Sequence, residues 1–280
     1  MQWDRARSPA SAARHAVVEM RAWEIHAMDA SEEKYRRILG VRFFTGGAAE
    51  AVALGLGGGL MVAPSAPVLV GAAEDPATQA ALLDSDLAIT DSGLMILMWR
   101  LLRREKLVRV SGLEYLKLLL REPALRERGA VLWIMPGEDA LLRNIAWLRQ
   151  LGCPVGPDDC YIAPQYPPGP LADPLLLSRI NAARPAHVIM AIGGGVQERL
   201  GHFLKKNAEY RPAIHCTGAA IGFLSGDQIG IPVWADRFFL GWLFRCLSAP
   251  HRFIPRYWKA AKLISMMIGN RSSTGPTLAQ

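Results

Sequence analysis

Apolar residues along this chain fall into short continuous runs and longer stretches with helical spacing. The short runs predict buried strands at residues 60–71, 86–90, 130–135, 187–192 and 213–217. The helical stretches predict helices at residues 46–56, 75–85, 93–103, 113–121, 138–151 and 173–183, and another from Val196. Because strands and helices alternate, we predict an α/β fold with a Rossmann-like, mostly parallel sheet and helices on both faces.

The same pattern divides the chain into four parts. Residues 1–37 predict a helical N-terminal extension, and residues 38–230 an α/β domain. Residues 231–271 predict a helical appendage, and residues 272–280 a disordered tail. The longest uncharged stretch, residues 51–73, raises the question of a transmembrane helix, but glycines and prolines interrupt it. We interpret this stretch as a helix end, a loop and a buried strand.

Composition narrows the class of protein. The chain has 280 residues, of which 51% are hydrophobic, so it can bury a large core. Its four cysteines form no Cys-x-x-Cys pair, its six histidines show no metal-ligand spacing, and no early run resembles a secretory signal. We therefore expect a cytoplasmic protein without a metal or other cofactor.

Positive charge is concentrated in the predicted appendage. This segment contains seven basic residues and one acidic residue, Asp236. Its net charge is therefore +6, compared with +7 for the whole chain. The appendage also holds eight of the chain's 22 aromatic residues. Such a mixture suits an anionic membrane surface, and its apolar content is too high for a solvated nucleic-acid arm, so we expect no nucleic acid partner. A packed helix pair with an incidental basic face is the alternative.

Residues 187–202 predict a buried strand, a glycine turn and a helix. Gly193 and Gly194 lack Cβ atoms, so a diphosphate could approach the backbone N–H groups where the helix starts. Gln197 and Glu198 lie in the first helical turn, where their side chains could meet a nucleotide sugar. The alternative is a purely structural turn in which Glu198 is favoured by the helix dipole.

Two polar residues follow other predicted elements. In open α/β sheets, ligands bind beyond the carboxyl ends of the strands. Asp91 follows the strand at 86–90 and could take a proton from an attacking hydroxyl, or could cap the helix at 93–103. Arg109 precedes a turn into the next helix and could hold a phosphate bidentately, or pair with a surface carboxylate.

Taken in order, these motifs resemble the WecG/TagA/CpsF family of bacterial glycosyltransferases from about Ile38 to Tyr257. Residues 75–93 are similar to the family's block that ends in Asp-Gly, with one residue inserted before the glycine. Residues 109–114 resemble its Arg-Val-Thr-Gly-x-Asp element, and residues 192–198 its Gly-x-Pro-Lys-Gln-Glu loop. The tail from Trp242 is similar to its Trp-Leu-x-Arg and Glu-Pro-x-Arg ending.

The resemblance implies an inverting, metal-independent transfer of a sugar from a UDP-sugar donor to a polyprenyl-diphosphate-linked acceptor. The enzyme would act in cell-surface or exopolysaccharide biosynthesis, peripherally bound to the inner face of the cell membrane, with a homo-oligomer possible. By the family's pattern Asp91 would be the catalytic base. Arginines and backbone N–H groups would neutralise the leaving diphosphate. The predicted substrate-binding residues are Ser65, Arg109, Gly193, Gly194, Gln197, Glu198, Arg245, Arg252 and Arg256.

The chain departs from the family pattern at several polar positions. The family's Thr-Leu-Asn falls on residues 63–65 (Ala-Pro-Ser), and its loop Pro-Lys on residues 195–196 (Gly-Val). Gly222 and Gly241 stand where the family has Asp and Glu. Three explanations of these differences compete. The protein could use another donor or acceptor, it could be a pseudoenzyme that binds nucleotide sugar or lipid, or it could be a non-catalytic partner subunit of a polysaccharide synthesis complex. We favour the active transferase because Asp91, Arg109, Gln197 and the arginines of the tail all remain.

Overall fold

A computed structural model describes residues 33–226 and 261–269. Within them an eight-stranded sheet has the order β1-β2-β4-β3-β8-β7-β5-β6. The strands are β1 (Tyr35–Ile38), β2 (Val41–Phe44), β3 (Gly59–Val62), β4 (Leu87–Ile89), β5 (Val131–Met135), β6 (Cys160–Ile162), β7 (His187–Met190) and β8 (Ala213–Cys216). The β1–β2 pair is antiparallel and every other pair is parallel. The predicted mostly parallel α/β sheet is confirmed.

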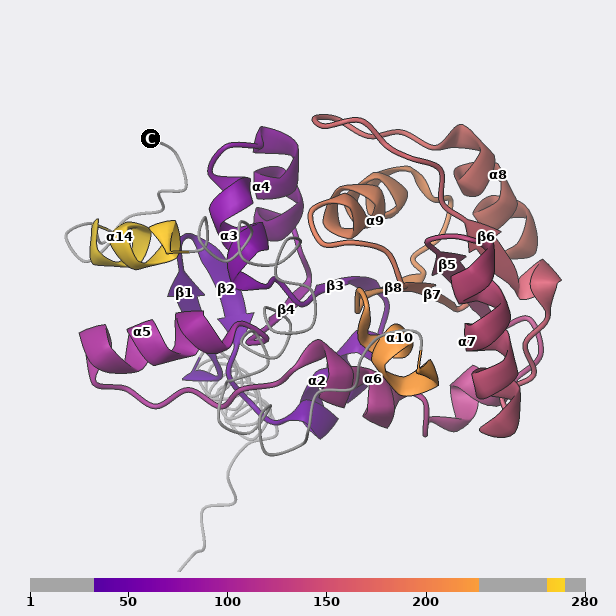
Figure 1. The fold of residues 1–280 in the computed structure, drawn as a ribbon, viewed down its shortest axis with the longest axis horizontal. Helices are drawn as coiled ribbons and strands as arrows, with labels where there is room; N and C mark the ends of the chain where they lie inside the picture. Colours follow the sequence, from indigo (N-terminus) through magenta and orange to yellow (C-terminus); the bar gives the residue numbers. More distant parts are fainter. Residues whose placement is uncertain (1–32, 227–260, 270–280) are drawn as a thin grey trace, which may run out of the picture.

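Helices cover both faces of this sheet (Figure 1). On one face lie α3 (Ala66–Ala72), α4 (Pro76–Leu83), α5 (Gly93–Arg103), α8 (Pro174–Ala183), α9 (Val196–Asn207) and α14 (Lys262–Gly269). On the other lie α2 (Ala48–Leu56), α6 (Gly112–Leu119), α7 (Glu138–Gln150) and α10 (Ala220–Ser225). Two short 3-10 helices, η1 (Pro123–Arg126) and η2 (Pro157–Asp159), lie in connecting segments.

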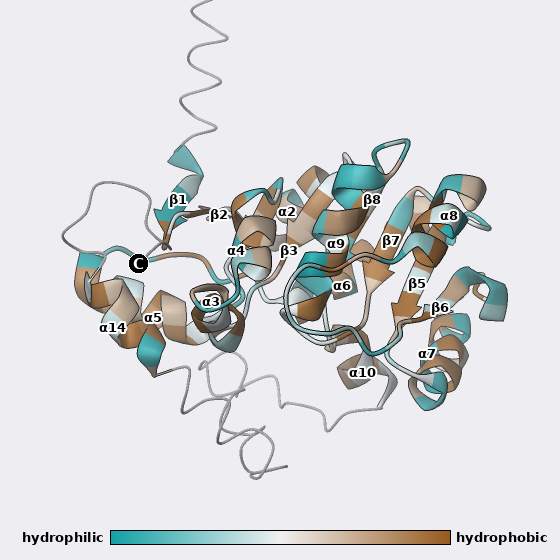
Figure 2. Ribbon diagram, turned by 90° about the horizontal axis from the view of Figure 1, so that it is seen from above, coloured by the Kyte–Doolittle hydropathy of each residue, from teal (hydrophilic) through white to brown (hydrophobic). Residues whose placement is uncertain are grey.

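The core forms two layers because side chains of a strand point alternately to opposite faces. In β5, Leu132 and Ile134 join the layer under α9, whereas Trp133 and Met135 join the layer under α6 and α7. Both sets are buried, which explains why the strands read as continuous apolar runs. Figure 2 shows β5 and β7 in brown, with teal residues on the neighbouring helices α7, α8 and α9.

The predicted strand at 60–71 is wrong in its second half. The strand β3 ends at Val62, and residues 66–72 form the helix α3. Pro67 explains the error, because a proline within an apolar run usually interrupts a helix. It lies in the first turn of α3, where a backbone N–H has no partner within the helix and proline is tolerated.

The β1–β2 hairpin and β6 were not predicted. Each of these strands has only three or four residues, too few for a clear alternation. Leu39 and Gly40 both have positive φ, as in the tight turns that favour Asn-Gly, and leucine gives no signal for such a turn. Because β1 begins at Tyr35, the sheet starts before the limit predicted between residues 37 and 38.

Other predicted parts lie partly outside the described residues. The predicted extension lies outside them up to residue 32, as do the predicted tail at 272–280 and most of the predicted appendage. The helix α14 is the described portion of that appendage. Its Leu263 and Met267 are buried in the layer that also contains α3 and α5, so this portion belongs to the core.

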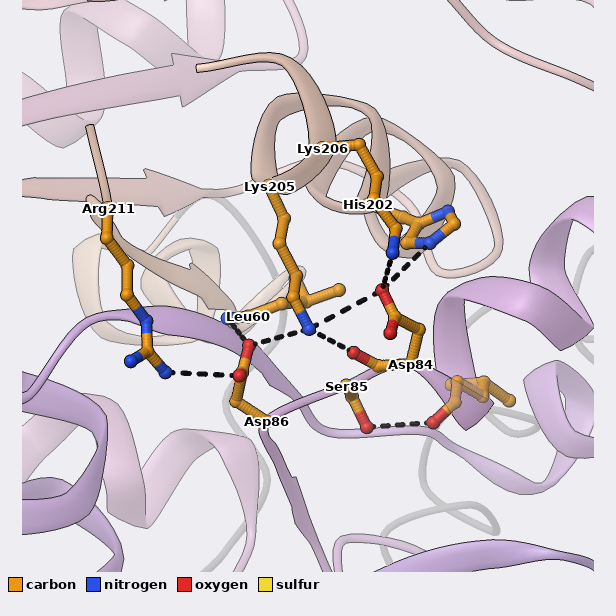
Figure 3. Close-up of polar contacts among 9 residues, drawn as sticks. Leu60, Asp84, Ser85, Asp86, His202, Lys205, Lys206 and Arg211 are labelled. Atoms are coloured by element: carbon orange, nitrogen blue, oxygen red, sulfur yellow. Dashed lines mark hydrogen bonds and ion pairs between the residues drawn. The ribbon is translucent and has the colours of Figure 1, made fainter. Parts of the chain in front are cut away.

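A cluster of charged side chains lies at the amino-terminal ends of the central strands β3 and β4 (Figure 3). The Asp86 carboxylate accepts a hydrogen bond from the N–H of Leu60 at 2.7 Å. It also lies 3.1 Å from the Arg211 guanidinium and 3.0 Å from the Lys205 ammonium. Asp84 lies 2.9 Å from the Lys206 ammonium. These contacts join the start of β3 and the segment before β4 to the last turn of α9.

Replacing Asp86 by alanine should therefore destabilise the fold by about 1–3 kcal/mol, because it leaves the Leu60 N–H without its acceptor and removes the counter-charge of two cations. Urea unfolding would measure this change in the free energy of unfolding. As a control, Glu50→Ala removes an exposed ion pair with Lys34 and a hydrogen bond to the exposed start of α2, and should cost less. Equal losses in the two variants would contradict a structural role for the Asp86 contacts.

Candidate functional site

The carboxyl ends of three neighbouring strands converge on the first turn of α6. A Cβ atom added to Gly112 would lie 3.5 Å from Ala63 Cβ, 3.5 Å from the carbonyl oxygen of Thr217 and 4.0 Å from Asp91 Oδ1. These residues follow β3, β8 and β4 in turn. The chain continues from β3 to α3 on one face and from β8 to α10 on the other. Where neighbouring connections diverge in this way, open α/β sheets bind their ligands.

Asp91 points its carboxylate at the start of α6. Its Oδ1 accepts the N–H of Gly112 at 3.0 Å. The cap of α5 is instead Ser92, whose Oγ accepts the N–H of Met95 at 3.2 Å, so the alternative role of Asp91 as that helix cap is wrong. The α6 dipole favours a negative charge here. No described residue makes a hydrogen bond to Asp91 Oδ2, so this oxygen can accept a proton from a ligand.

Arg109 lies beside Asp91 in the folded chain. Its Nε–H donates to the Asp91 carbonyl oxygen at 3.0 Å. The buried hydroxyl of Thr90 donates to the Val108 carbonyl at 2.7 Å and accepts the Val110 N–H at 3.1 Å. These bonds hold the segment around Arg109 against the end of β4. A carboxylate and a guanidinium are thus placed together at the strand ends.

Ser65 lies at the end of β3, where α3 begins. It is the N-cap of α3, but its side chain makes no capping hydrogen bond. Ala63 and Pro64 before it present no polar side-chain atoms. The β3 end therefore contributes one hydroxyl where the family pattern has two polar side chains.

The glycine turn after β7 is only partly as predicted. A Cβ on Gly193 would meet nothing within 4 Å, so a ligand has room there, and Gly194 is half-buried. However, the N–H of Gly195 donates to the Glu198 carboxyl group at 2.5 Å. The helix start is therefore already occupied in part by the protein's own carboxyl group. Phosphate binding at Gly193 and Gly194 stays a prediction.

Gln197 and Glu198 are buried, and their polar atoms bond within the protein. Gln197 Oε1 accepts the N–H of Gly218 at 2.8 Å, and its Nε2 donates to Glu198 Oε1 at 3.0 Å. This chain of bonds ties the first turn of α9 to the segment after β8. In this structure both side chains position the two strand ends, and their contact with a nucleotide stays a prediction.

Several contributors to the site were not singled out in the sequence. Thr90, Gly112, Thr217 and Gly218 all follow a strand or begin a helix at the carboxyl edge. The strand-end rule that selected Asp91 would have found Thr90, Thr217 and Gly218. Gly112 required knowledge of where α6 packs, which periodicity does not supply.

Arg199 was also missed. It is buried, and its Nε–H donates to the Gly195 carbonyl at 3.2 Å. Its Nη1 donates to the carbonyl of Pro167 at 2.9 Å and to that of Gly169. The guanidinium also lies 3.7 Å from Asp75. Arg199 therefore fastens the proline-rich surface loop at residues 163–170 beside the glycine turn.

A buried polar chain supports α6 from below the site. Tyr115 Oη lies 2.9 Å from His215 Nδ1, and His215 Nε2 lies 3.2 Å from His187 Nδ1. Burial lowers the pKa of His215 to about 3, and it also lowers the pKa of His187. Both imidazoles are therefore neutral near pH 7. The chain links α6 to β8 and β7 and so fixes the helix that carries Gly112.

The predicted Arg245, Arg252 and Arg256 lie outside the described residues. Within residues 33–226 and 261–269, His, Cys, Asp and Glu side chains form no group of three that could hold a metal ion. The described helices include none that combines the length and the apolar character needed to cross a membrane.

Comparison with known proteins places this site in a family. A search of individually curated proteins gave no significant match. The sequence profile described as the Glycosyl transferase WecG/TagA/CpsF family matches residues 36–275, which include every strand of the sheet except the first residue of β1. The chain therefore belongs to the WecG/TagA/CpsF family of glycosyltransferases.

Proposed function

We propose that this family member is an inverting, metal-independent glycosyltransferase that moves a sugar from a UDP-sugar to a polyprenyl-diphosphate-linked acceptor in cell-surface or exopolysaccharide biosynthesis. One observation carries the proposal: the Asp91 carboxylate, whose Oδ2 accepts no hydrogen bond from a described residue, lies directly beside Arg109 at the diverging strand ends. A base and a cation are the two groups that direct displacement of a diphosphate requires.

The proposed reaction is a single displacement. Asp91 takes the proton of the acceptor hydroxyl while the oxygen of that hydroxyl attacks the anomeric carbon of the donor sugar. The bond between that carbon and the UDP oxygen breaks with its electron pair moving to the diphosphate, and attack from the opposite side inverts the configuration. The Arg109 guanidinium and the amides at Gly193 and Gly194 would stabilise the growing negative charge on UDP. This set of groups needs no metal.

We further propose that the basic, aromatic segment at 231–271 holds the protein on an anionic membrane surface at the inner face of the cell membrane. Its local charge of +6 and eight aromatic residues support this. Arg245, Arg252 and Arg256 would add cations to the diphosphate site.

A non-catalytic protein that binds nucleotide sugar or lipid is the second candidate. The family's Thr and Asn at the end of β3 are replaced by Ala63 and Ser65, and Ala63 faces the start of α6. A protein of this kind would bind UDP or a lipid-linked sugar without forming a transfer product. Product formation from a panel of UDP-sugars separates the two candidates.

The phosphate site predicts that Arg109→Ala and Gly193→Val each weaken UDP binding. Removing a charged hydrogen-bond donor should reduce affinity by about 10- to 100-fold. The Gly193 change should leave the fold intact, because its Cβ meets no protein atom, and should act only by blocking a bound diphosphate. Calorimetric titration with UDP in the presence of EDTA measures both effects and the need for a metal.

The matched control is Gly47→Val, at the N-cap of α2, where a Cβ also meets nothing within 4 Å. This variant should bind UDP like the wild type. Unchanged affinity in Arg109→Ala and Gly193→Val would show that the turn is structural only. Loss of UDP binding in EDTA would contradict metal independence.

A further inference from the structure

The outward face of α5 combines exposed leucines with arginines. Four residues at helical spacing form one stripe along α5: Leu97, Arg100, Leu101 and Arg104. The last of them, Arg104, is the C-cap residue that ends the helix. Leu97 is 47% exposed and Leu101 is 65% exposed, and both arginines are exposed. The opposite side of α5 is buried through Met95 and Ile96. We name the set Leu97, Arg100, Leu101 and Arg104 the α5 face.

Positive charge is concentrated here as well as in the tail. Residues 93–110 contain five basic residues and one acid, Glu105. That acid is occupied, since Arg36 donates to it at 2.8 Å and Trp99 Nε1 at 3.0 Å. Within the described part of the chain, neither Arg100 nor Arg104 is paired with a carboxylate. The α5 face thus carries an uncompensated positive charge next to apolar side chains.

The helix is fixed relative to the active site. It begins at Ser92, directly after Asp91, and its far end is tied to β1 by the Arg36–Glu105 bond. After α5 the chain continues through Arg109 to α6 (Figure 1). Hydrogen bonds join Val108 and Arg109 to Thr90 and Asp91, so the segment that contains α5 begins and ends beside β4. A helix of this length spans about 16 Å. The α5 face therefore lies within one helix length of the proposed base.

We propose that the α5 face docks on an anionic phospholipid bilayer, with the two leucines inserted among the headgroups and the two arginines on lipid phosphates. Charge complementarity favours this occupant, since a surface of cations around exposed leucines matches an anionic interface with an apolar interior. Docking would place Asp91 and Arg109 at headgroup level, where the diphosphate of a lipid-linked acceptor lies. This contact deepens the proposed function and rests on it for its purpose, but it can be measured without any sugar transfer.

The test is co-sedimentation of the full chain with vesicles of phosphatidylcholine containing about one third phosphatidylglycerol, at low salt. Arg100→Gln/Arg104→Gln should weaken binding about 30-fold, since each arginine near an anionic surface contributes about a factor of five. Leu97→Glu/Leu101→Glu should weaken it at least as much, because carboxylates would replace apolar side chains at the interface. Binding of the wild type to pure phosphatidylcholine should be much weaker.

Matched controls change the same residue types elsewhere. Arg121→Gln/Arg128→Gln and Leu142→Glu/Leu175→Glu alter exposed arginines and leucines on other elements and should bind vesicles like the wild type. Equal binding by the α5-face variants and the wild type would overturn the proposal, as would a wild type that ignores anionic vesicles. A dimer that dissociates only in the α5-face variants would assign the face to a second copy and would also overturn it.

A transfer assay with a water-soluble diphosphate-linked acceptor separates this proposal from the proposed function. The α5-face variants should transfer to that acceptor at the wild-type rate and lose activity only on acceptor embedded in vesicles. If no variant and no wild type transfers sugar, yet vesicle binding still depends on the α5 face, the membrane contact stands and the transferase proposal falls. Full transfer to embedded acceptor by the α5-face variants would overturn the docking proposal.

Discussion

Asp91→Asn should lower the rate of sugar transfer by about 10² to 10⁴ while leaving UDP affinity and the fold unchanged, as expected for loss of a general base. In this structure the substitution should remove proton acceptance at position 91 and keep the structural hydrogen bond. Asparagine Oδ1 can still accept the Gly112 N–H that Asp91 Oδ1 accepts at 3.0 Å, so the start of α6 keeps its contact. The amide nitrogen that replaces Oδ2 cannot take a proton. Steady-state rates with a UDP-sugar and a diphosphate-linked acceptor would measure the change.

A matched control is Asp139→Asn, which removes an exposed carboxylate from the first turn of α7 and should transfer at the wild-type rate. Wild-type transfer by Asp91→Asn would reduce Asp91 to a structural contact of α6. If the wild type itself binds UDP and forms no product, the non-catalytic candidate is correct.

Much of the fold could be predicted because hydrophobic periodicity reports burial directly. Strands β5, β7 and β8 are buried on both faces and read as continuous apolar runs, which is the pattern of a parallel sheet between helices. The errors occur where local geometry overrides that pattern. The helix α3 starts with a proline in its first turn, and the β1–β2 turn places Leu39 at positive φ, a conformation with no sequence signal in leucine.

The site was predictable only as far as the strand-end rule reaches. That rule selected Asp91, which follows β4, but it did not predict that Arg109, which follows α5, lies beside it. It could not show that Ser92 caps α5 in place of Asp91, nor that Gln197 folds back onto Gly218. Side-chain direction within the first turn of a helix depends on which acceptor lies nearest in the folded chain. Periodicity carries no information about such long-range partners.

The free energy of unfolding should fall steeply as the pH is lowered below 6.5, because of the buried His215. Its folded-state pKa is about 3, whereas an unfolded histidine has a pKa of about 6.5. Since the unfolded chain takes up the proton first, the stabilisation is complete above pH 6.5 and is lost as the pH falls towards 3. The full loss is on the order of 5 kcal/mol, of which about 2 kcal/mol falls between pH 7 and pH 5. His187, whose pKa is also lowered by burial, acts in the same direction.

Urea unfolding at pH 7, 6 and 5 would measure this slope in a range above the titration of ordinary carboxylates. The test variant is His215→Gln, because an amide can still bond to Tyr115 and His187 but does not titrate. Its unfolding free energy should be lower than that of the wild type at pH 7, and it should change less between pH 7 and pH 5. The same slope in both proteins would mean that protonation of His215 is not what limits stability in acid. A flatter slope in the variant would tie acid sensitivity to the chain of bonds that holds α6, and with it Gly112, against the carboxylate of Asp91, the proposed base.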